Sequence, residues 1–312
     1  MARICYLRCY LLTKNTVYSR CNQDWQFKPN EGGMPLGPNP DGSLQRFGES
    51  CLVLNVYTPR NTTANSSLPV LVFGHGGGDA NGASSMGRPL LLNGSNAVQA
   101  APHISVTINY RLAALGYLAH PAFASEPNGS VGNFGLTDHL QALRWVRAHI
   151  AEFGGDRDSI LFFGQSSGAN HALWIPLMKP FRGLVRAVAA HSACSQPFYN
   201  PDCGAEHSKH ASELTALAFG RKHNCTSGDD AEMRACLRAI PLAQLAKGPS
   251  PFTGPQPYYG SELLPDLPFE MYRRGEFDHT VKIMAGHNSG EYFQRVFLVT
   301  RFGFLFYHKV LD

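Results

Sequence analysis

The stretch that decides the fold is SILFFGQSSG, residues 159–168. Its apolar, strand-favouring run leads directly into the pattern G-x-S-x-G around Ser166, and a helix-compatible segment, 169–178, follows. A strand, a sharp turn and a helix in this order lift the serine hydroxyl clear of the carboxyl edge of a sheet. The backbone N–H of Ser167 then lies at a helix start, where unpaired donors can stabilise an oxyanion. The pattern predicts a nucleophilic serine. The alternative is a tight turn without chemistry, because five-residue patterns recur by chance.

Composition places the chain among ordinary globular proteins. It has 312 residues, of which 44% are hydrophobic and 16% are charged, and its formal net charge is +4. This length is enough for one large α/β domain or two smaller ones. Lysines and arginines are dispersed, which argues against nucleic acid or an anionic membrane as a partner. Every apolar run is shorter than the roughly 18–20 residues of a membrane span, so no transmembrane segment is expected.

Buried strands are predicted to alternate with helices along the chain. Besides the serine strand, apolar runs favour strands at residues 52–57, 69–73, 104–110, 185–191 and 281–285. Apolar residues recur at steps of three and four between Leu136 and Phe153, which is typical of one amphipathic helix that Gly154 ends. Residues 207–245 look helical in pieces, and 13–50 look irregular. This alternation predicts an α/β layer fold with a mostly parallel sheet, whose catalytic groups follow the carboxyl ends of strands.

Loops after two other predicted strands carry groups that suit acyl transfer. A nucleophilic serine needs a base, usually a histidine, and a carboxylate that orients the base. The glycine run 76–78 follows one strand, and Gly77 and Gly78 can turn their N–H groups toward an oxyanion because no Cβ intervenes. Glu291 follows the last strand. Taken alone, the glycine run also fits a flexible loop, and a glutamate is usually a solvated surface residue.

Several longer motifs occur in order along most of the chain. They are ESCLVLNVYTP at 49–59, HGGG at 75–78, NYRL at 109–112, LGYL at 115–118, GNFGLTD at 132–138, ALRWV at 142–146, FGGD at 153–156, the serine turn, the segment 257–275 and GHNSGE at 286–291. Together they are highly specific. From about Cys21 to Glu291, the chain resembles the type-B carboxylesterase and cholinesterase-like family. The resemblance implies an α/β-hydrolase fold: a mostly parallel central sheet flanked by helices, here without the C-terminal strand and helical region.

The resemblance also implies roles for individual residues. Ser166 matches the nucleophile of a serine carboxylic ester hydrolase and Glu291 the acidic member of its triad. The matching oxyanion donors are the backbone N–H groups of Gly77, Gly78 and Ser167. Such a lipase-like esterase acts on small-molecule esters or lipids and needs no metal or cofactor. Residues 1–20 then form a non-matching N-terminal segment and 21–312 a partial domain, while the oligomeric state stays open.

Cysteines and glycosylation sequons favour the secretory pathway. The chain has eight cysteines. The resemblance pairs Cys21 with Cys51 and Cys225 with Cys236, and proximity alone suggests Cys194 with Cys203. Five N-x-[ST] sequons begin at Asn61, Asn65, Asn93, Asn128 and Asn224. We therefore expect a secreted or lumenal protein, although no signal peptide is evident, because Arg8 interrupts the apolar run near the amino terminus.

Two departures from the family's pattern bear on catalysis. The family's histidine lies far beyond the acid, and no histidine of this chain occupies a matching position. The weak candidates for the base are His75, His139, His149, His287 and His308. Asp79 stands where an aromatic residue is usual, and its carboxylate would oppose an oxyanion unless it is paired or turned away. We therefore expect an esterase family whose activity is weak or absent in this stretch. The alternative is an inert fragment or a catalytically inactive, cholinesterase-like binding or adhesion domain.

Overall fold

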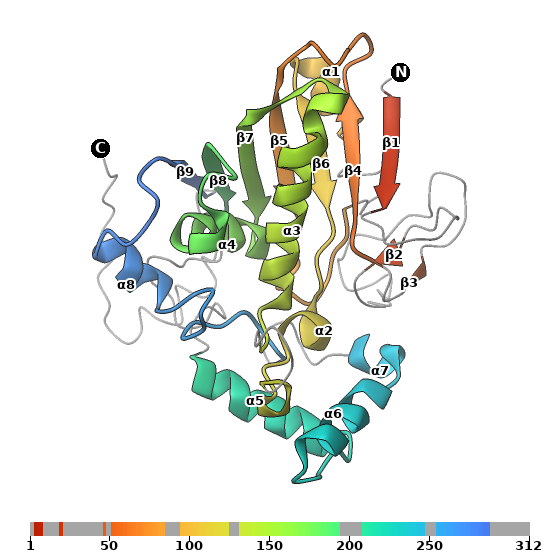
Figure 1. Ribbon diagram of the computed structural model, residues 1–312, viewed down its shortest axis with the longest axis vertical. Coiled ribbons are helices and arrows are strands. Elements are labelled where there is room, and N and C mark those ends of the chain that lie inside the picture. Colours follow the sequence, from red (N-terminus) through yellow and green to blue (C-terminus); the bar gives the residue numbers. More distant parts are fainter. Residues whose placement is uncertain are drawn as a thin grey trace, which may run out of the picture.

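A computed structural model describes residues 3–8, 19–20, 46–47, 51–84, 94–124, 131–193, 208–246 and 254–287. Within them, a seven-stranded sheet has the order β1-β4-β6-β5-β7-β8-β9 (Figure 1). Its strands are β1 (Arg3–Arg8), β4 (Val53–Thr58), β5 (Leu68–Gly74), β6 (Ile104–Ile108), β7 (Gly155–Gln165), β8 (Ala187–His191) and β9 (Lys282–Gly286). The short strands β2 (Ser19–Arg20) and β3 (Arg46–Phe47) pair separately. The strands from β6 to β9 are parallel, whereas β4 and β1 are antiparallel to their neighbours, so the predicted mostly parallel sheet is confirmed.

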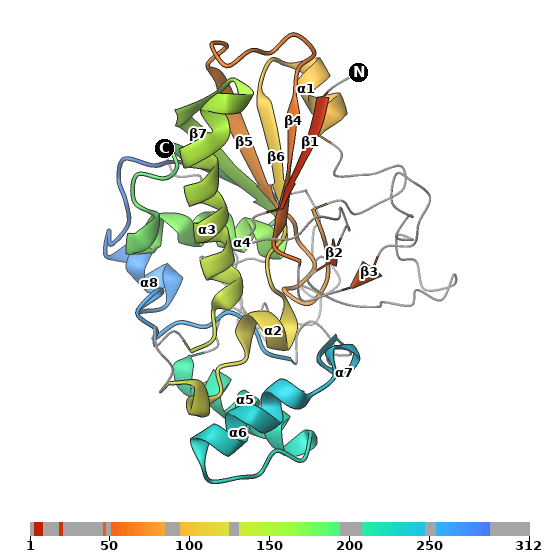
Figure 2. The ribbon, with the colours of Figure 1, turned by 45° about the vertical axis from the view of Figure 1, so that its right-hand side comes forward.

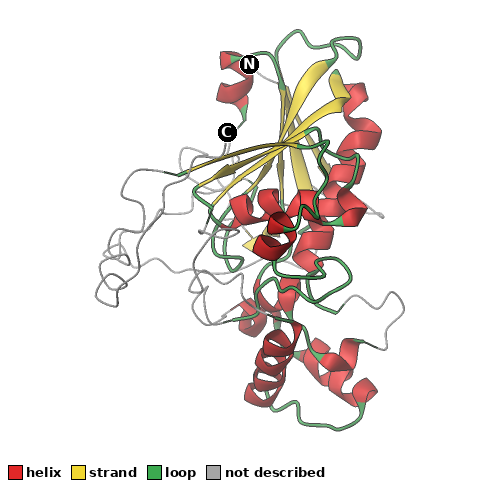
Figure 3. Ribbon diagram, turned by 90° about the vertical axis from the view of Figure 1, so that its left-hand side faces the viewer, coloured by secondary structure: helices red, strands yellow, loops and turns green. Residues whose placement is uncertain are grey.

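The central strands are buried because helices cover both faces of the sheet. Every residue of β6 is buried, and Ile104, Val106 and Ile108 have no exposed surface. Near-continuous apolar runs of this kind are typical of parallel strands that pack on two sides. Figure 3, which views the sheet nearly edge on, shows helices on both sides of it.

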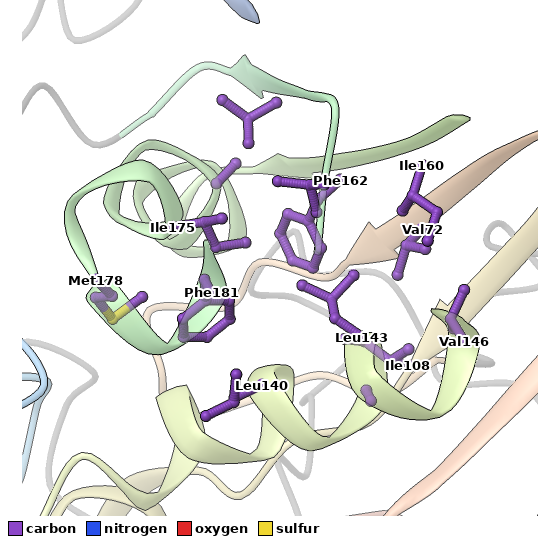
Figure 4. Close-up of a cluster of buried hydrophobic side chains, with 14 of the residues drawn as sticks. Val72, Ile108, Leu140, Leu143, Val146, Ile160, Phe162, Ile175, Met178 and Phe181 are labelled. Atoms are coloured by element: carbon purple, nitrogen blue, oxygen red, sulfur yellow. The ribbon is translucent and has the colours of Figure 1, made fainter. Parts of the chain in front are cut away.

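The predicted amphipathic helix is α3 (Phe134–His149), which a 3₁₀ turn at Ile150–Phe153 extends. Gly154 ends it in the left-handed conformation, with φ of 81°, and β7 begins at once. The apolar stripe of α3 packs on the sheet, so that Leu143 faces Phe162 of β7 and Leu140 faces Phe181 in the core (Figure 4). Short helices flank the strands elsewhere: α1 (Ser95–Ala100), α2 (Ala113–Tyr117), α4 (Ser167–Trp174) and α8 (Pro268–Arg273).

A group of helices lies beyond one end of the sheet (Figure 2). These are α5 (Lys209–Lys222), α6 (Asp230–Ala239) and α7 (Leu242–Ala246), as the helical pieces at 207–245 predicted. They form a second apolar cluster around Phe219 and Leu237. The predicted disulfide Cys225–Cys236 is confirmed. It joins the loop between α5 and α6 to α6 itself. In the described ranges, no helix combines the length and apolar character that a membrane span requires.

Two elements differ from the expectations. The strand β1 was not predicted, because its alternation is weak and its partner β4 lies far along the chain. The helix predicted over 169–178 is shorter: α4 ends at Trp174, and a 3₁₀ turn at Ile175–Leu177 follows. Pro176 explains the change, because proline cannot donate the hydrogen bond that continues an α-helix.

Candidate active site

The parallel register brings the loops after four strands to one edge of the sheet. Gly74 at the end of β5 pairs with Gly164 of β7, and Gln165 pairs with His191 at the end of β8. His191 in turn pairs with Gly286 of β9. The glycine run and Ser166 therefore leave the sheet side by side, as the sequence predicted. Glu291 follows β9 but lies outside the described residues.

Ser166 occupies a strained turn between β7 and α4. Its backbone has φ of 57° and ψ of −126°, which non-glycine residues rarely adopt. Its N–H donates to the carbonyl oxygen of His191 at 3.0 Å. The flanking glycines are required by close packing: a Cβ on Gly164 would lie 2.2 Å from the carbonyl oxygen of Gly168, and a Cβ on Gly168 2.2 Å from that of Gly74. Strain held by packing of this kind is typical of functional positions.

The glycine loop packs directly against this turn. A Cβ on Gly76 would lie 2.9 Å from the Cβ of Ser166. Gly77 and Gly78 have positive φ values of 122° and 62°, which turn the backbone sharply. In the part of the chain that the structure describes, the N–H groups of Gly77, Gly78 and Ser167 donate to no acceptor. The loop thus presents free backbone donors beside the serine, which is the arrangement that an oxyanion hole needs.

Hydrogen bonds from distant segments hold the glycine loop from behind. The Tyr110 hydroxyl donates to the His75 carbonyl oxygen at 2.7 Å, and the Gln256 amide donates to that of Gly78 at 3.1 Å. The N–H of Asp79 donates to the Ser167 hydroxyl oxygen at 3.3 Å. Burial, reinforced by the nearby Asp79 charge, raises the pKa of Tyr110 well above its usual value, so the hydroxyl keeps its proton. These contacts fix the loop relative to α4.

Asp79 is paired and buried. Its carboxylate is 3.1 Å from Nε2 of His171 and accepts a 3.4 Å hydrogen bond from the Tyr117 hydroxyl. Nδ1 of His171 is 3.3 Å from Nε2 of His139, whose own Nδ1 is 2.8 Å from the Gly135 carbonyl oxygen. The carboxylate therefore lies against a histidine side chain in the protein interior. The sequence did not point to His171, because a lone histidine on a helix carries no motif.

Comparison with known proteins bears directly on this geometry. Residues 13–301 match the profile of the carboxylesterase family. The chain belongs to the carboxylesterase family. It is 32% identical over 258 residues to fumonisin B1 esterase of Sphingopyxis macrogoltabida, 30% over 265 residues to acylcarnitine hydrolase of Mus musculus and 34% over 265 residues to mouse liver carboxylesterase 1.

These matches cover most of the chain but less than half of each relative. They span 78%, 84% and 79% of this chain, and 43%, 44% and 43% of the respective relatives. The family membership confirms the resemblance on which the site residues rest. The chain thus spans less than half the length of these relatives.

The candidate histidines of this carboxylesterase-family chain lie in different surroundings. His75 is buried with Nδ1 2.9 Å from the Gly76 carbonyl oxygen, and burial lowers its pKa to about 4. His139 lies in α3 as predicted, while His149 is exposed and pairs with Glu152. His287 follows β9, and His308 lies outside the described residues. No histidine among the described residues hydrogen-bonds to the Ser166 hydroxyl.

The remaining predicted sites divide between described and undescribed parts of the carboxylesterase domain. Cys51 is buried and disulfide-bonded, but Cys21 is not described, so their pairing stays a prediction. Cys194 and Cys203 are also outside the described residues. Three sequon asparagines, Asn61, Asn65 and Asn224, are exposed, and the other two, Asn93 and Asn128, are not described.

Proposed function

We propose that the chain carries the serine nucleophile and oxyanion hole of a carboxylic ester hydrolase. The observation that carries this proposal is the strained Ser166 turn packed against a glycine loop with free N–H groups. In the proposed reaction, Oγ of Ser166 attacks the acyl carbon of an ester, and the alcohol leaves as the acyl-enzyme forms. Water then releases the acid. The N–H groups of Gly77, Gly78 and Ser167 stabilise the oxyanion in both steps, and each is expected to contribute roughly 3–4 kcal/mol.

Proton transfer to and from the serine hydroxyl also needs a base and a carboxylate that orients the base. We propose Glu291 as this carboxylate, because the resemblance matches it to the family's acidic residue and it follows Gly286 by five residues, where β9 ends beside β8. The base stays unassigned. His75 directly precedes the glycine run, and its Nδ1 is 2.9 Å from the Gly76 carbonyl oxygen. Its buried Nε2 has no hydrogen-bond partner among the described residues, so this imidazole does not hydrogen-bond to the Ser166 hydroxyl.

A second candidate function is that of a non-catalytic binding domain on the same scaffold. It is favoured by one observation, that no described histidine hydrogen-bonds to the Ser166 hydroxyl. Retention of the strained serine turn favours the esterase, because a strained backbone costs about 1–3 kcal/mol and a binding surface does not require it. Hydrolysis assays separate the two functions.

The test is hydrolysis of p-nitrophenyl butyrate by the purified chain, its Ser166→Ala variant and a Ser66→Ala control. Ser66 lies in an exposed turn, where its hydroxyl accepts the N–H of Thr63 at 3.0 Å. We expect weak turnover at most, which Ser166→Ala should abolish and Ser66→Ala should leave unchanged. Turnover that survives Ser166→Ala would contradict the nucleophile assignment. No turnover in the unmodified, folded chain would favour the binding domain.

We also propose a secretory setting and a small-molecule ester as the substrate class. The disulfide Cys225–Cys236 and the exposed sequon asparagines Asn61, Asn65 and Asn224 support the setting. The family supports the substrate class. Expression in mammalian cells followed by endoglycosidase digestion tests the setting: a mobility shift that becomes smaller when all three asparagines are changed to glutamine is the expected result. An unshifted secreted protein would contradict glycosylation at these positions.

A further inference from the structure

A chain of buried titratable side chains lies behind the glycine loop and takes no part in the ester chemistry described above. It connects His139 of α3, His171 of α4 and Asp79, which directly follows Gly78. All three side chains are almost wholly buried. A buried charge is costly unless it is paired and hydrogen-bonded. The positions of the protons on these three side chains therefore decide whether their burial is stable.

The hydrogen bonds determine the tautomer of His139. Its Nδ1 is 2.8 Å from the Gly135 carbonyl oxygen, which can only accept, so Nδ1 carries a proton. Burial, with a smaller contribution from the neighbouring His171, lowers the pKa of His139 well below its usual value, so the ring is neutral. Its Nε2 is therefore a bare acceptor. That atom faces Nδ1 of His171 at 3.3 Å, so His171 must donate from Nδ1.

With Nδ1 of His171 protonated, the protonation of its other ring nitrogen, Nε2, is still to be decided. If His171 carried only its Nδ1 proton, the partly negative Nε2 would lie 3.1 Å from a carboxylate oxygen of Asp79. Two electronegative atoms repel each other at that distance, which favours a second ring proton, on Nε2. The contact has the length of an ion pair, although Nε2 has no hydrogen bond of good angular geometry.

We propose that His171 is an imidazolium paired with the Asp79 carboxylate, and that both are positioning residues for the oxyanion hole. The Tyr117 hydroxyl donates to the same carboxylate, which favours its ionised form. The ring centroids of Tyr110 and Trp174 lie 5.3 Å and 5.4 Å from that of His171, within the range of cation–π attraction. The pair is neutral overall, so it adds no net charge beside a developing oxyanion.

Other titratable groups around the pair do not supply an alternative proton. From the loop after β5 comes His75, whose pKa burial lowers to about 4. From α2 and the loop after β6 come Tyr117 and Tyr110, whose pKa values burial raises. From α3 comes Asp138, which is engaged by Arg111 at 2.7 Å.

The pair links the two parts of the proposed oxyanion hole. Asp79 continues the backbone of Gly78, and His171 lies one helical turn after Ser167 in α4. The ion pair therefore ties the loop that offers the glycine N–H groups to the helix that offers the Ser167 N–H. The hydrogen bond from the Asp79 N–H to the Ser167 hydroxyl acts across the same junction. This catalytic consequence rests on the proposed function, whereas the protonation state does not.

The first test is ¹⁵N NMR of the histidine rings in the folded protein at pH 7.5. We expect both ring nitrogens of His171 to be protonated and His139 to carry its proton on Nδ1 alone. In Asp79→Asn, His171 should lose its Nε2 proton, because a neutral amide can donate to that nitrogen. Comparison with His171→Gln assigns the signals. A bare Nε2 on His171 in the unmodified protein would overturn the proposal, as would an unchanged His171 in Asp79→Asn.

The second test is the dependence of stability on pH. His171→Gln leaves the Asp79 carboxylate buried without a cation, and breaking such a pair should lower Tm by roughly 5–15 °C at pH 8. Because the folded variant then binds a proton more tightly than the unfolded chain, its Tm should recover as the pH falls toward 5. The double variant Asp79→Asn/His171→Gln removes the charge and should recover most of the loss at pH 8. A His171→Gln variant with the stability and pH profile of the unmodified protein would contradict the pairing.

A matched control is available on the surface. His149 and Glu152 form a histidine–carboxylate pair at 3.2 Å in which both side chains are exposed. His149→Gln should change Tm by no more than about 2 °C, because exposed ion pairs contribute little. These readouts do not depend on turnover, so an inactive chain leaves them interpretable. In a chain that hydrolyses esters, His171→Gln should lower kcat about tenfold or more while KM changes little.

Discussion

One close approach in the candidate site is that of α4 to the end of β5, just before the glycine loop, and Gly168→Ala tests it. A Cβ at this position would lie 2.2 Å from the Gly74 carbonyl oxygen and 2.6 Å from that of His75. Both obstacles are backbone atoms, so no side-chain rotation can relieve the contact. Real Cβ atoms essentially never come within 3.0 Å of another heavy atom, so the helix and the loop must separate by about 0.8 Å, the difference between 3.0 Å and 2.2 Å.

This separation should affect stability and rate together. Inserting a methyl group into a packed interior costs typically about 1–3 kcal/mol, and two backbone contacts place Gly168→Ala at the upper end. For a chain of this size that corresponds to a fall in Tm of roughly 5–10 °C. The same movement pulls the Ser167 N–H away from those of Gly77 and Gly78. A misplacement of about 1 Å at a reacting centre can lower the rate about 10²-fold.

The assay is thermal unfolding of three alanine variants, with ester turnover measured in parallel. Gly228 has open space around the added Cβ and an ordinary φ, so Gly228→Ala should leave Tm unchanged or slightly raised. Gly183 also has open space but a φ of 73°, so Gly183→Ala should cost about 1 kcal/mol through backbone strain alone. Gly168→Ala should be the most destabilised. Equal stability of Gly168→Ala and Gly228→Ala would refute the close packing of α4 on the loop.

Three further predictions concern the same structure. Gln256→Leu removes the 3.1 Å hydrogen bond to the Gly78 carbonyl oxygen and should cost about 1 kcal/mol by urea denaturation. Ester turnover in this variant should fall through kcat, and a change confined to KM would count against a role in holding the loop. Replacing Cys225 and Cys236 together by alanine should cost about 3 kcal/mol, the loop-entropy value for a separation of 11 residues, and an unchanged urea midpoint would refute this. Because burial lowers the pKa of His75 from 6.5 to about 4, the unfolded chain binds the extra proton first as the pH falls. The unfolding free energy should then drop by about 3 kcal/mol between pH 6.5 and 4, and a flat profile would contradict the buried neutral imidazole.

The sequence predicted those parts of the fold that depend on local pattern. The stripe from Leu136 to Phe153 has the period of a helix, and α3 with its 3₁₀ extension covers it. The apolar runs became β5, β6 and β7 with ends displaced by a few residues. The strand β1 depends on pairing with β4 some fifty residues later, and such a contact has no local signal. Within the site, the strained turn at Ser166 was predicted because glycines flank it.

The contacts that hold the candidate site could not be predicted from the sequence, for a related reason. Gln256 and Gly78 are 178 residues apart, and His171 comes from a different element than Asp79. Whether the Asp79 carboxylate opposes an oxyanion depends on its direction, and the backbone at φ of 55° turns it toward His171. The direction of such a side chain is set by the assembled fold. The sequence therefore could not predict whether the Asp79 carboxylate is paired, whereas the structure shows that it lies against His171.

Covalent labelling of Ser166 tests the central claim most directly. The folded chain is treated with a fluorophosphonate, and intact-mass and peptide mass spectrometry locate the product. An oxyanion hole beside the half-buried Ser166 predicts one phosphonyl group, on Ser166, formed faster than on Gly168→Ala and absent from Ser166→Ala. A folded chain that acquires no label, or acquires it on another serine, would contradict the proposal that this turn and glycine loop form an esterase site.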